Sequence, residues 1–227
     1  MIKPHGSDEL NPLFVYDQKE HHELSREAES LPSLMVSSAA AANAVMLGAG
    51  YFNPLTGYMN LADAMSVAER MHTTDNLFWP TPVLNLTNNI ETVKGHKRIA
   101  LRDPNVEEHP ILAVMEVDDI EEISETEMNF IAEKVYRTTD SEHPGVATFM
   151  NQGHYALSGK IKVLNFSYFQ QDFPDTFRTA VEIRNEIKER GWNKVVAFQT
   201  RNPMHLAHEE LCHMAMDRLG CDGLVIH

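Results

Sequence analysis

The sequence is poor in cysteine, because Cys212 and Cys221 are the only two among 227 residues. Two cysteines are too few for a disulfide framework, and a chain of this length buries enough surface to fold without one. Long apolar runs are also missing: no stretch approaches the roughly 20 residues of a membrane-spanning helix, and the N-terminus lacks the apolar segment of a secretory signal. We therefore expect a cytoplasmic protein without a membrane partner.

Positive charge is scarce as well. The chain carries 19 lysines and arginines against 33 aspartates and glutamates, which gives a formal net charge of −14. Broad nucleic-acid binding requires a basic surface, so we expect no nucleic acid among the partners. An acidic protein still binds an anionic substrate where hydrogen-bond donors and positive charge are concentrated locally.

The first 165 residues predict a mixed α and β domain. Apolar residues at helical spacing, with Asn60 as an N-cap and Gly48-Ala49-Gly50 as a helix stop, indicate helices over 31–47, 61–71 and 126–136. Short apolar or alternating runs predict strands at 82–86, 97–102, 111–117 and 157–164. Several short strands separated by turn signals favour a small barrel-like β core decorated by helices.

A second domain is predicted for residues 166–227. A capping box at Thr179 and Glu182 opens a helix that ends at Gly191. A buried strand at 195–198, a helix from about 203 to 219 and a strand from 223 then form a βαβ unit. One such unit cannot cover both faces of its sheet, so we expect these residues to be only the beginning of an α/β domain.

The polar run between that strand and helix carries the candidate chemistry. Asn202 and Pro203 suit the N-cap and first position of the helix, whose free N–H groups and positive dipole end attract anions. Arg201 adds a planar cation suited to a tetrahedral oxyanion, and Gln199 and Thr200 add neutral donors. Ligands of open α/β sheets bind at this end of the strands.

Two histidines follow within the first turns of the predicted helix. His205 and His208 are three residues apart and so share one flank. We expect an apolar stripe beside them to pack on the sheet, formed by Met204, Ala207, Leu211 and Ala215. Chance pairs of histidines at this spacing are common, and the specificity comes from the longer run Gln-Thr-Arg-Asn-Pro-Met-His-x-Ala-His-Glu.

That run, residues 199–209, resembles the active-site motif of ATP sulfurylases, and its His-x-x-His part resembles the wider nucleotidylyltransferase superfamily, in which glycine often replaces Ala207. Flanking runs also resemble the family: His-Pro-Gly-Val at 143–146, Leu-Ser-Gly at 157–159, Phe-Pro at 173–174, Phe-Arg at 177–178 and Gly-Trp at 191–192. The resemblance implies an α+β then α/β chain, with a PUA-like, β-barrel-containing domain at 1–165 and the start of a Rossmann-like catalytic domain at 166–227. The family's catalytic domain continues past this point with a second arginine-bearing motif, so we expect residues 1–227 to lack part of the site.

The resemblance also implies an activity: reversible conversion of ATP and sulfate to adenylyl sulfate and pyrophosphate, with Mg²⁺ carried mainly by ATP. Gln199 and Arg201 would hold sulfate, Thr200 and Asn202 would position sulfate and the α-phosphate, and His205 and His208 would contact the ATP phosphates. Thr200, Arg201 and Asn202 would be the catalytic set. Family members often form homo-oligomers, which we therefore expect, whereas the physiological direction of the reaction stays open.

Two alternatives compete with this interpretation. The first is a metal site on the flank of the second helix; its candidate ligands are His205, His208, Cys212, His213, Cys221 and His227. The run His208-Glu-Glu-Leu-Cys212 departs from the His-Glu-x-x-His pattern at its last residue, and no Cys-x-x-Cys pair supports zinc, so no protein metal ligand is predicted. The second alternative is a protein that only binds, because some PUA-like domains bind RNA; the net charge disfavours RNA here.

Overall fold

The computed structural model describes residues 2–227, which divide into two compact units. The N-terminal unit comprises residues 4–177, and the C-terminal unit comprises residues 178–227 with residues 2 and 3. Phe166 belongs to the core of the N-terminal unit, and Phe169 and Phe177 pack against that core. The compact unit thus runs to Phe177, while the division at residue 166 stays a prediction.

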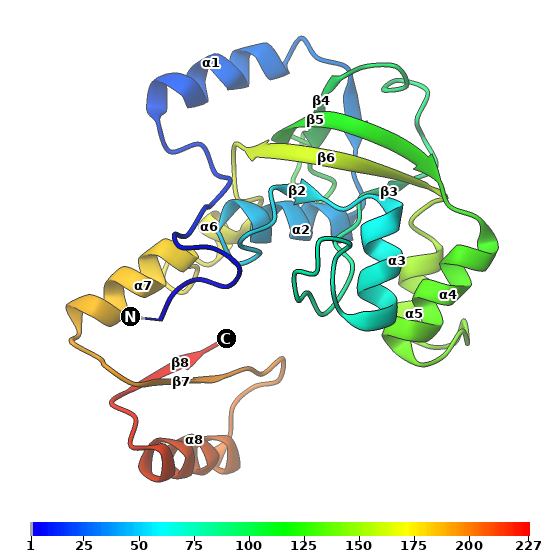
Figure 1. Cartoon of the computed structure of the whole chain (residues 1–227). Helices are drawn as coiled ribbons and strands as arrows, with labels where there is room; N and C mark the ends of the chain where they lie inside the picture. The colour runs from blue at the N-terminus through cyan, green and yellow to red at the C-terminus, as the bar shows by residue number, and fades with distance from the viewer. Residues whose placement is uncertain (1) are drawn as a thin grey trace. The chain divides into compact units, whose positions relative to one another are not determined.

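The N-terminal unit contains a six-stranded sheet and six helices within the described residues (Figure 1). Its elements are, in chain order, α1 (Gln18–Ala28), β1 (Ser33–Met35), α2 (Ser38–Gly48), β2 (Gly57–Tyr58), α3 (Leu61–Arg70), β3 (Leu86–Thr87), β4 (Arg98–Arg102), β5 (Ile111–Glu122), α4 (Glu125–Tyr136), α5 (Pro144–Met150), β6 (Tyr155–Val163) and α6 (Phe169–Asp172).

The sheet of this unit is open. Its strand order is β1-β4-β5-β6-β2, with β3 also paired to β6. Only the β1–β4 pairing is parallel, and β4, β5 and β6 form an antiparallel meander in which Ala113 lies opposite Val163. The expected barrel is therefore wrong for the described residues: β1 and β2 lie at opposite ends of the strand order and do not pair, so the sheet does not close.

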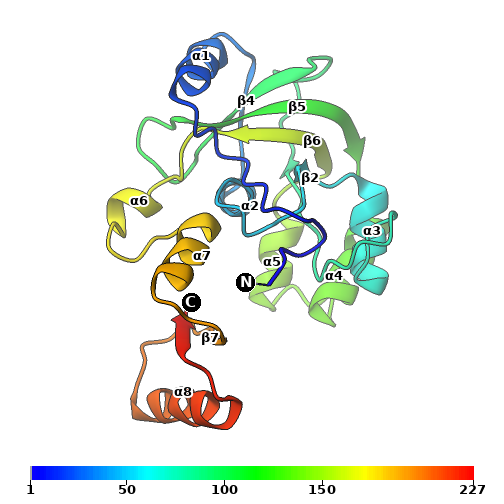
Figure 2. The same ribbon diagram turned by 60° about the vertical axis from the view of Figure 1, so that its left-hand side comes forward.

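Helices cover both faces of the sheet (Figures 1 and 2). The largest core lies between α2 and one face, where Leu34, Leu47 and Leu101 are almost fully buried. A smaller core on the other face joins α1, through Leu24, to Val114. A third cluster joins α3, α4 and α5 to the sheet through Met128 and Ile131. Each helix buries one apolar stripe, which is how an amphipathic helix is stabilised in a globular protein.

Local signals in the sequence placed several elements correctly. Asn60 caps α3 by accepting a hydrogen bond from the Asp63 N–H at 2.8 Å, and Ser124 forms a reciprocal capping box with Glu127 at the start of α4. The strands predicted at 97–102, 111–117 and 157–164 are β4, β5 and β6. These helices and strands are confirmed, with β5 extending to Glu122.

Two predicted elements need correction. The helix expected over 31–47 begins only at Ser38, because Ser37 caps it by accepting from the Ala40 N–H at 3.1 Å and the preceding residues 33–35 form β1. The strand expected at 82–86 pairs as β3 only at Leu86 and Thr87. Pro82 lacks an N–H, which disfavours regular pairing at that end.

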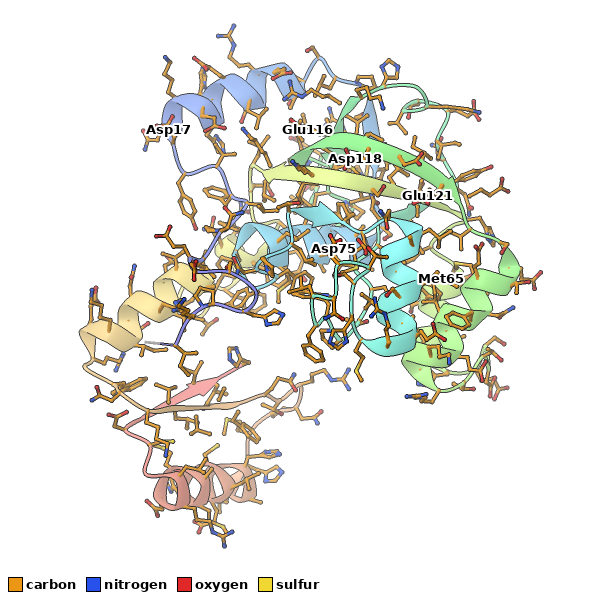
Figure 3. All side chains as sticks on the ribbon, in the orientation of Figure 1. Asp17, Met65, Asp75, Glu116, Asp118 and Glu121 are labelled. Carbon is orange, nitrogen blue, oxygen red and sulfur yellow. The ribbon has the colours of Figure 1, made fainter. Side chains whose placement is uncertain are left out.

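Several acidic side chains lie at the start of α1 and along β5. Asp17 at the start of α1 and Glu116, Asp118 and Glu121 along β5 are labelled in Figure 3. Asp17 is also an N-cap, accepting from the Glu20 N–H at 2.8 Å. None of the helices within residues 2–227 combines the length and the apolar character needed to cross a bilayer.

The C-terminal unit contains α7 (Ala180–Glu189), β7 (Val195–Phe198), α8 (Leu206–Leu219) and β8 (Gly223–Ile226). The capping box of Thr179 and Glu182 at α7 is confirmed. The two strands are parallel, with Val195 opposite Gly223 and Phe198 opposite Ile226, so the predicted strand–helix–strand unit is confirmed. Trp192 packs so closely on Gly223 that a Cβ there would lie 2.3 Å from the indole.

The β5–β6 pairing depends on a glycine, which generates a first prediction. The register shifts between Val117 and Asp119, and Gly159 opposite has φ +143°; a Cβ on it would lie 2.0 Å from the Glu116 carbonyl oxygen. Gly159→Ala should lower the free energy of unfolding by about 2 kcal/mol or more, because strain and backbone overlap add. Urea denaturation measures the change.

Gly95→Ala is the matched control for this measurement. Gly95 also has positive φ, +79°, but a Cβ there meets nothing within 4 Å. We expect a loss of about 1 kcal/mol, from backbone strain alone. Equal losses at Gly95 and Gly159 would show that the approach to Glu116 contributes nothing.

Candidate active site

The candidate site begins where β7 ends in the C-terminal unit. Pairing between β7 and β8 continues past the strands, because the His227 N–H donates to the Phe198 carbonyl at 2.8 Å and the Thr200 N–H donates to the His227 carbonyl at 3.0 Å. The polar run that follows Phe198 therefore leaves the sheet at the C-terminal end of a parallel strand. Ligands bind at this end in open α/β sheets.

A short turn then presents Arg201 to solvent. The Thr200 hydroxyl oxygen accepts a hydrogen bond from the Asn202 N–H at 3.1 Å and lies 3.2 Å from the Asn202 carbonyl, to which the hydroxyl donates. Such local hydroxyl–backbone bonds define a turn and take the place of helical bonds. Arg201 lies at its tip, exposed and without an ion pair to any residue that the structure describes.

The helix start predicted at Asn202 and Pro203 is wrong. Helix α8 begins at Leu206, and His205 is its N-cap with extended backbone, φ −141° and ψ 171°. The cause is the Thr200–Asn202 turn together with the His208 side chain, whose Nδ1 accepts a hydrogen bond from the His205 N–H at 3.4 Å. His208 thus does at position N3 what Glu or Gln does in a capping box.

This correction moves the anion-binding end of the helix toward the histidines. The His208 and Glu209 N–H groups both donate to the His205 carbonyl, whereas no hydrogen bond is present at the N–H groups of Leu206 and Ala207 within residues 2–227. Free N–H groups and the positive end of the helix dipole attract an anion. The donors now lie beside His205 and His208 instead of beside Asn202.

The two imidazoles are the most closely associated pair in the site. Their ring centroids are 3.9 Å apart with an interplanar angle of 34°, and the His208 ring also lies 5.6 Å from that of Phe198. Because His208 Nδ1 accepts from a backbone N–H, its neutral ring carries the proton on Nε2. The Nε2–H donor of His208 therefore points away from the His205 N–H that caps the helix.

The structure gathers the predicted residues to different degrees. Hydrogen bonds join Thr200 to Asn202, and ring contact joins His205 to His208. Gln199 and Arg201 lie on the same loop, but no hydrogen bond, ion pair or ring contact ties them to the imidazoles in the described residues. The loop and the first turn of α8 therefore carry all six predicted residues, and only the rings of the two histidines are in contact.

The apolar stripe predicted on α8 is also wrong. Cys212 is the buried residue of the helix, 3% exposed, whereas Leu206, Leu211 and Met214 are 82%, 51% and 39% exposed. Of the predicted stripe, Met204 and Leu211 are exposed and only Ala215 is half-buried, so the predicted residues do not form the packed face of α8. A pocket of about 410 Å³ lies between α8 and β8; His205, Cys212, His213 and Ile226 are among its lining residues.

The alternative of a metal site finds no support. Residues 2–227 contain no group of three histidine, cysteine, aspartate or glutamate side chains close enough to hold a metal ion. Both cysteines are free thiols: Cys212, on α8, is buried, and Cys221 is half-buried. At the opposite end of the strands from the site, directly before β8, Asp222 accepts backbone hydrogen bonds from Asn193 and Lys194, which hold the pKa of its carboxyl below the ordinary value.

Comparisons with known proteins define the class of the two parts. A family model described as a PUA-like domain matches residues 2–166, and a model described as ATP-sulfurylase matches residues 174–227. A solved structure of a hexameric APS kinase from Thiobacillus denitrificans resembles the whole chain with a TM-score of 0.76 and 27% identity, over 39% of that protein.

Relatives then settle the family. The chain is 65% identical to a sulfate adenylyltransferase of Allochromatium vinosum and 62% identical to one of Alcanivorax borkumensis, in each case over its whole length. It spans 57% of the length of each of these relatives. The chain belongs to the ATP sulfurylase family, and the resemblance inferred from the 199–209 run is confirmed.

The position of the helix start generates a second prediction. Asn202 contributes only backbone atoms to the observed turn, so Asn202→Ala should change the free energy of unfolding by less than about 0.5 kcal/mol. Thr179→Ala, at a true capping box, should cost about 1 kcal/mol and calibrates the measurement. A cost at Asn202 equal to that at Thr179 would restore Asn202 as the helix cap.

Proposed function

We propose that the protein is a sulfate adenylyltransferase, which interconverts ATP and sulfate with adenylyl sulfate and pyrophosphate. The observation that carries the proposal is the pair of closely packed, tilted imidazoles of His205 and His208 at the start of α8, directly after a turn that presents Arg201. Family membership supports it, as do relatives named sulfate adenylyltransferase. Because the chain spans 57% of those relatives, we propose that residues beyond this stretch also contribute to the complete activity.

The chemistry asks for charge neutralisation more than for proton transfer. Sulfate is fully ionised at neutral pH, so its attack needs no general base. Its difficulties are weak nucleophilicity and repulsion from the triphosphate, which an enzyme overcomes by holding both anions in line and stabilising charge on the leaving pyrophosphate. Hydrogen-bond donors and cations gathered at one strand end can hold the two anions and neutralise this charge.

Each residue of the run has a role in this proposal. Arg201, whose guanidinium is free of ion pairs in the described chain, holds sulfate together with Gln199. Thr200 and Asn202 position sulfate against the α-phosphate. His205 and His208, with the free N–H groups of Leu206 and Ala207, bind the ATP phosphates at the helix start.

Mg²⁺ enters the proposal only as a companion of ATP. Residues 2–227 offer no cluster of three ligands that could cage a metal, so the ion would be held by phosphate oxygens and water. Mg²⁺ would supply charge neutralisation on the phosphates. We further propose a homo-oligomer working in the cytoplasm; the similar APS kinase is hexameric.

Arg201→Ala tests the sulfate role. Loss of one charge-stabilising donor should lower kcat/KM for sulfate by about 10² to 10³, and Arg201→Lys should recover little, because it lacks the planar fork. The assay is sulfate-dependent pyrophosphate release, in a polypeptide of the length of the relatives. Arg190→Ala, which breaks an ion pair with Glu186 and a cation–π contact with Trp192, is the control and should retain activity. Near-normal turnover in Arg201→Ala would remove Arg201 from the site.

Variants at His208 separate phosphate binding from helix capping. His208→Ala should lower kcat by about 10² or more, if one charge-stabilising contact is worth a few kcal/mol. His208→Asn keeps a side-chain acceptor for the His205 N–H and should restore stability without restoring kcat. His22→Ala, at an exposed position of α1 in the N-terminal unit, should leave kcat unchanged. If His208→Asn regains full activity, the residue serves only to cap α8.

A further inference from the structure

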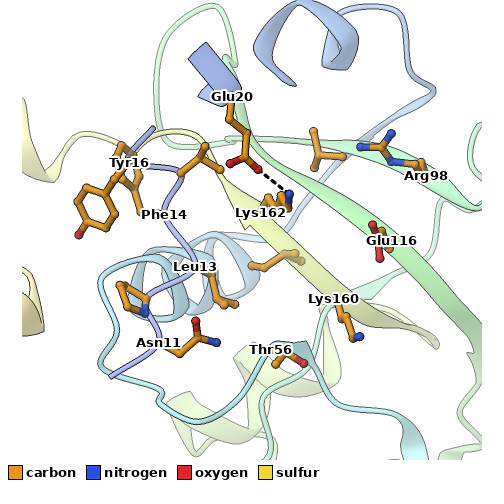
Figure 4. A pocket seen from close by; sticks show the side chains of 14 residues that line it. Asn11, Leu13, Phe14, Tyr16, Glu20, Thr56, Arg98, Glu116, Lys160 and Lys162 are labelled. Carbon is orange, nitrogen blue, oxygen red and sulfur yellow. Dashed lines mark hydrogen bonds and ion pairs between the residues drawn. The ribbon is translucent and has the colours of Figure 1, made fainter. Parts of the chain in front are cut away.

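A second pocket lies in the N-terminal unit, on the sheet face that α1 partly covers (Figure 4). Its volume is about 340 Å³, within the range of pockets that take small ligands. The walls come from the extended segment 11–16, the first turn of α1, and strands β4, β5 and β6. The proposed adenylyl-transfer site, in the C-terminal unit, shares no residue with it.

The lining is positively charged on a strongly acidic chain. Three cations, Arg98, Lys160 and Lys162, face two anions, Glu20 and Glu116, which gives a formal balance of +1 (3 − 2) against −14 for the chain. Strand register places Glu116 opposite both Arg98 and Lys160, so this row alternates in sign across β4, β5 and β6. A net positive pocket on such a chain favours an anionic occupant.

Only one of the three cations is available to a ligand. The Lys162 Nζ lies 2.6 Å from a Glu20 carboxylate oxygen, and Arg98 is paired with Glu27. Lys160 has no ion pair within 4.0 Å in the described residues, and its side chain is exposed. Glu116 lies opposite Lys160 on the neighbouring strand β5.

Two neutral polar side chains flank Lys160 without partners of their own. The side chains of Asn11 and Thr56 form no hydrogen bond in the described residues, although the Asn11 backbone N–H donates to Asn53 Oδ1 at 2.8 Å. Figure 4 shows Asn11, Thr56 and Lys160 along one end of the pocket and the Glu20–Lys162 ion pair at the other. An amide, a hydroxyl and an ammonium group together suit one anionic head group.

Between these ends the wall is apolar and firmly held. Leu13, Phe14 and Ile161 line it. The segment is tied to β6 because the Val15 N–H donates to the Val163 carbonyl at 3.0 Å, and Phe14 stacks on Phe166 with centroids 4.5 Å apart. A pre-formed apolar wall beside a single polar end loses little entropy when a ligand binds.

We propose that this pocket binds a small amphipathic monoanion, with its carboxylate or phosphate at Lys160, Thr56 and Asn11 and its apolar body along Leu13, Phe14 and Ile161. The probe is 4-phenylbutyrate, titrated by calorimetry into the 227-residue chain. We expect saturable binding with a Kd below about 1 mM, the affinity that a few good contacts provide. Its uncharged amide should bind at least about five-fold more weakly, as should inorganic phosphate, which lacks the apolar body.

Three variants decide whether the named residues are responsible. Lys160→Gln should weaken binding about five-fold or more, and Glu116→Gln should strengthen it, because an opposing carboxylate is removed. Lys94→Gln, which makes the same charge change outside this pocket, is the control and should bind as the parent does. All three positions are exposed, and a thermal melt of each variant checks that the fold is retained.

Contrary results are equally clear. Absence of binding up to 10 mM, which exceeds the weak-affinity limit by about ten-fold, would overturn the proposal. So would unchanged affinity in Lys160→Gln, or equal affinity for the acid and its amide. Tighter binding of inorganic phosphate than of 4-phenylbutyrate would overturn the role of the apolar wall. None of these outcomes bears on the adenylyl-transfer proposal, which concerns the other unit.

Discussion

The candidate site depends on one weak interaction, the hydrogen bond from the His205 N–H to His208 Nδ1 at 3.4 Å. It lets α8 begin at Leu206 and brings the two rings to a centroid distance of 3.9 Å. It also places the proton of the neutral His208 ring on Nε2, so that the Nε2–H can donate a hydrogen bond to a phosphate oxygen. One side chain thereby serves the fold and, in our proposal, the substrate.

Two of the runs that resemble the family have a clear structural role in the N-terminal unit. In the run 157–159, Gly159 adopts φ +143° at a register shift and leaves no space for a side chain against Glu116. In the run 143–146, His143 caps α5 by accepting from the Gly145 N–H at 3.2 Å and Pro144 opens the helix. These two runs therefore fix a strand irregularity and a helix start of the PUA-like part, and they lie outside the 199–209 run that carries the proposed chemistry.

Sequence reasoning succeeded where short-range physics decides. Caps at Asn60 and Thr179 and the apolar strands β5 and β6 follow from local spacing. It failed where a competing local bond or a distant pairing decides: the Thr200 hydroxyl displaced the helix start at Asn202, and the strand order kept the sheet open. The pocket beside Lys160 is lined by segments more than 140 residues apart in the sequence, so no local sequence pattern predicts it.

The central claim is that His205 and His208 at the start of α8 bind the phosphates of ATP. Histidine side-chain NMR spectra of a polypeptide of the length of the relatives, titrated with ATP and Mg²⁺, test it most directly. The account predicts that the resonances of His205 and His208 shift together along one saturable curve, while those of His22, on α1, stay in place. Shifts confined to other histidines, with His205 and His208 unmoved at saturating ATP, would contradict it.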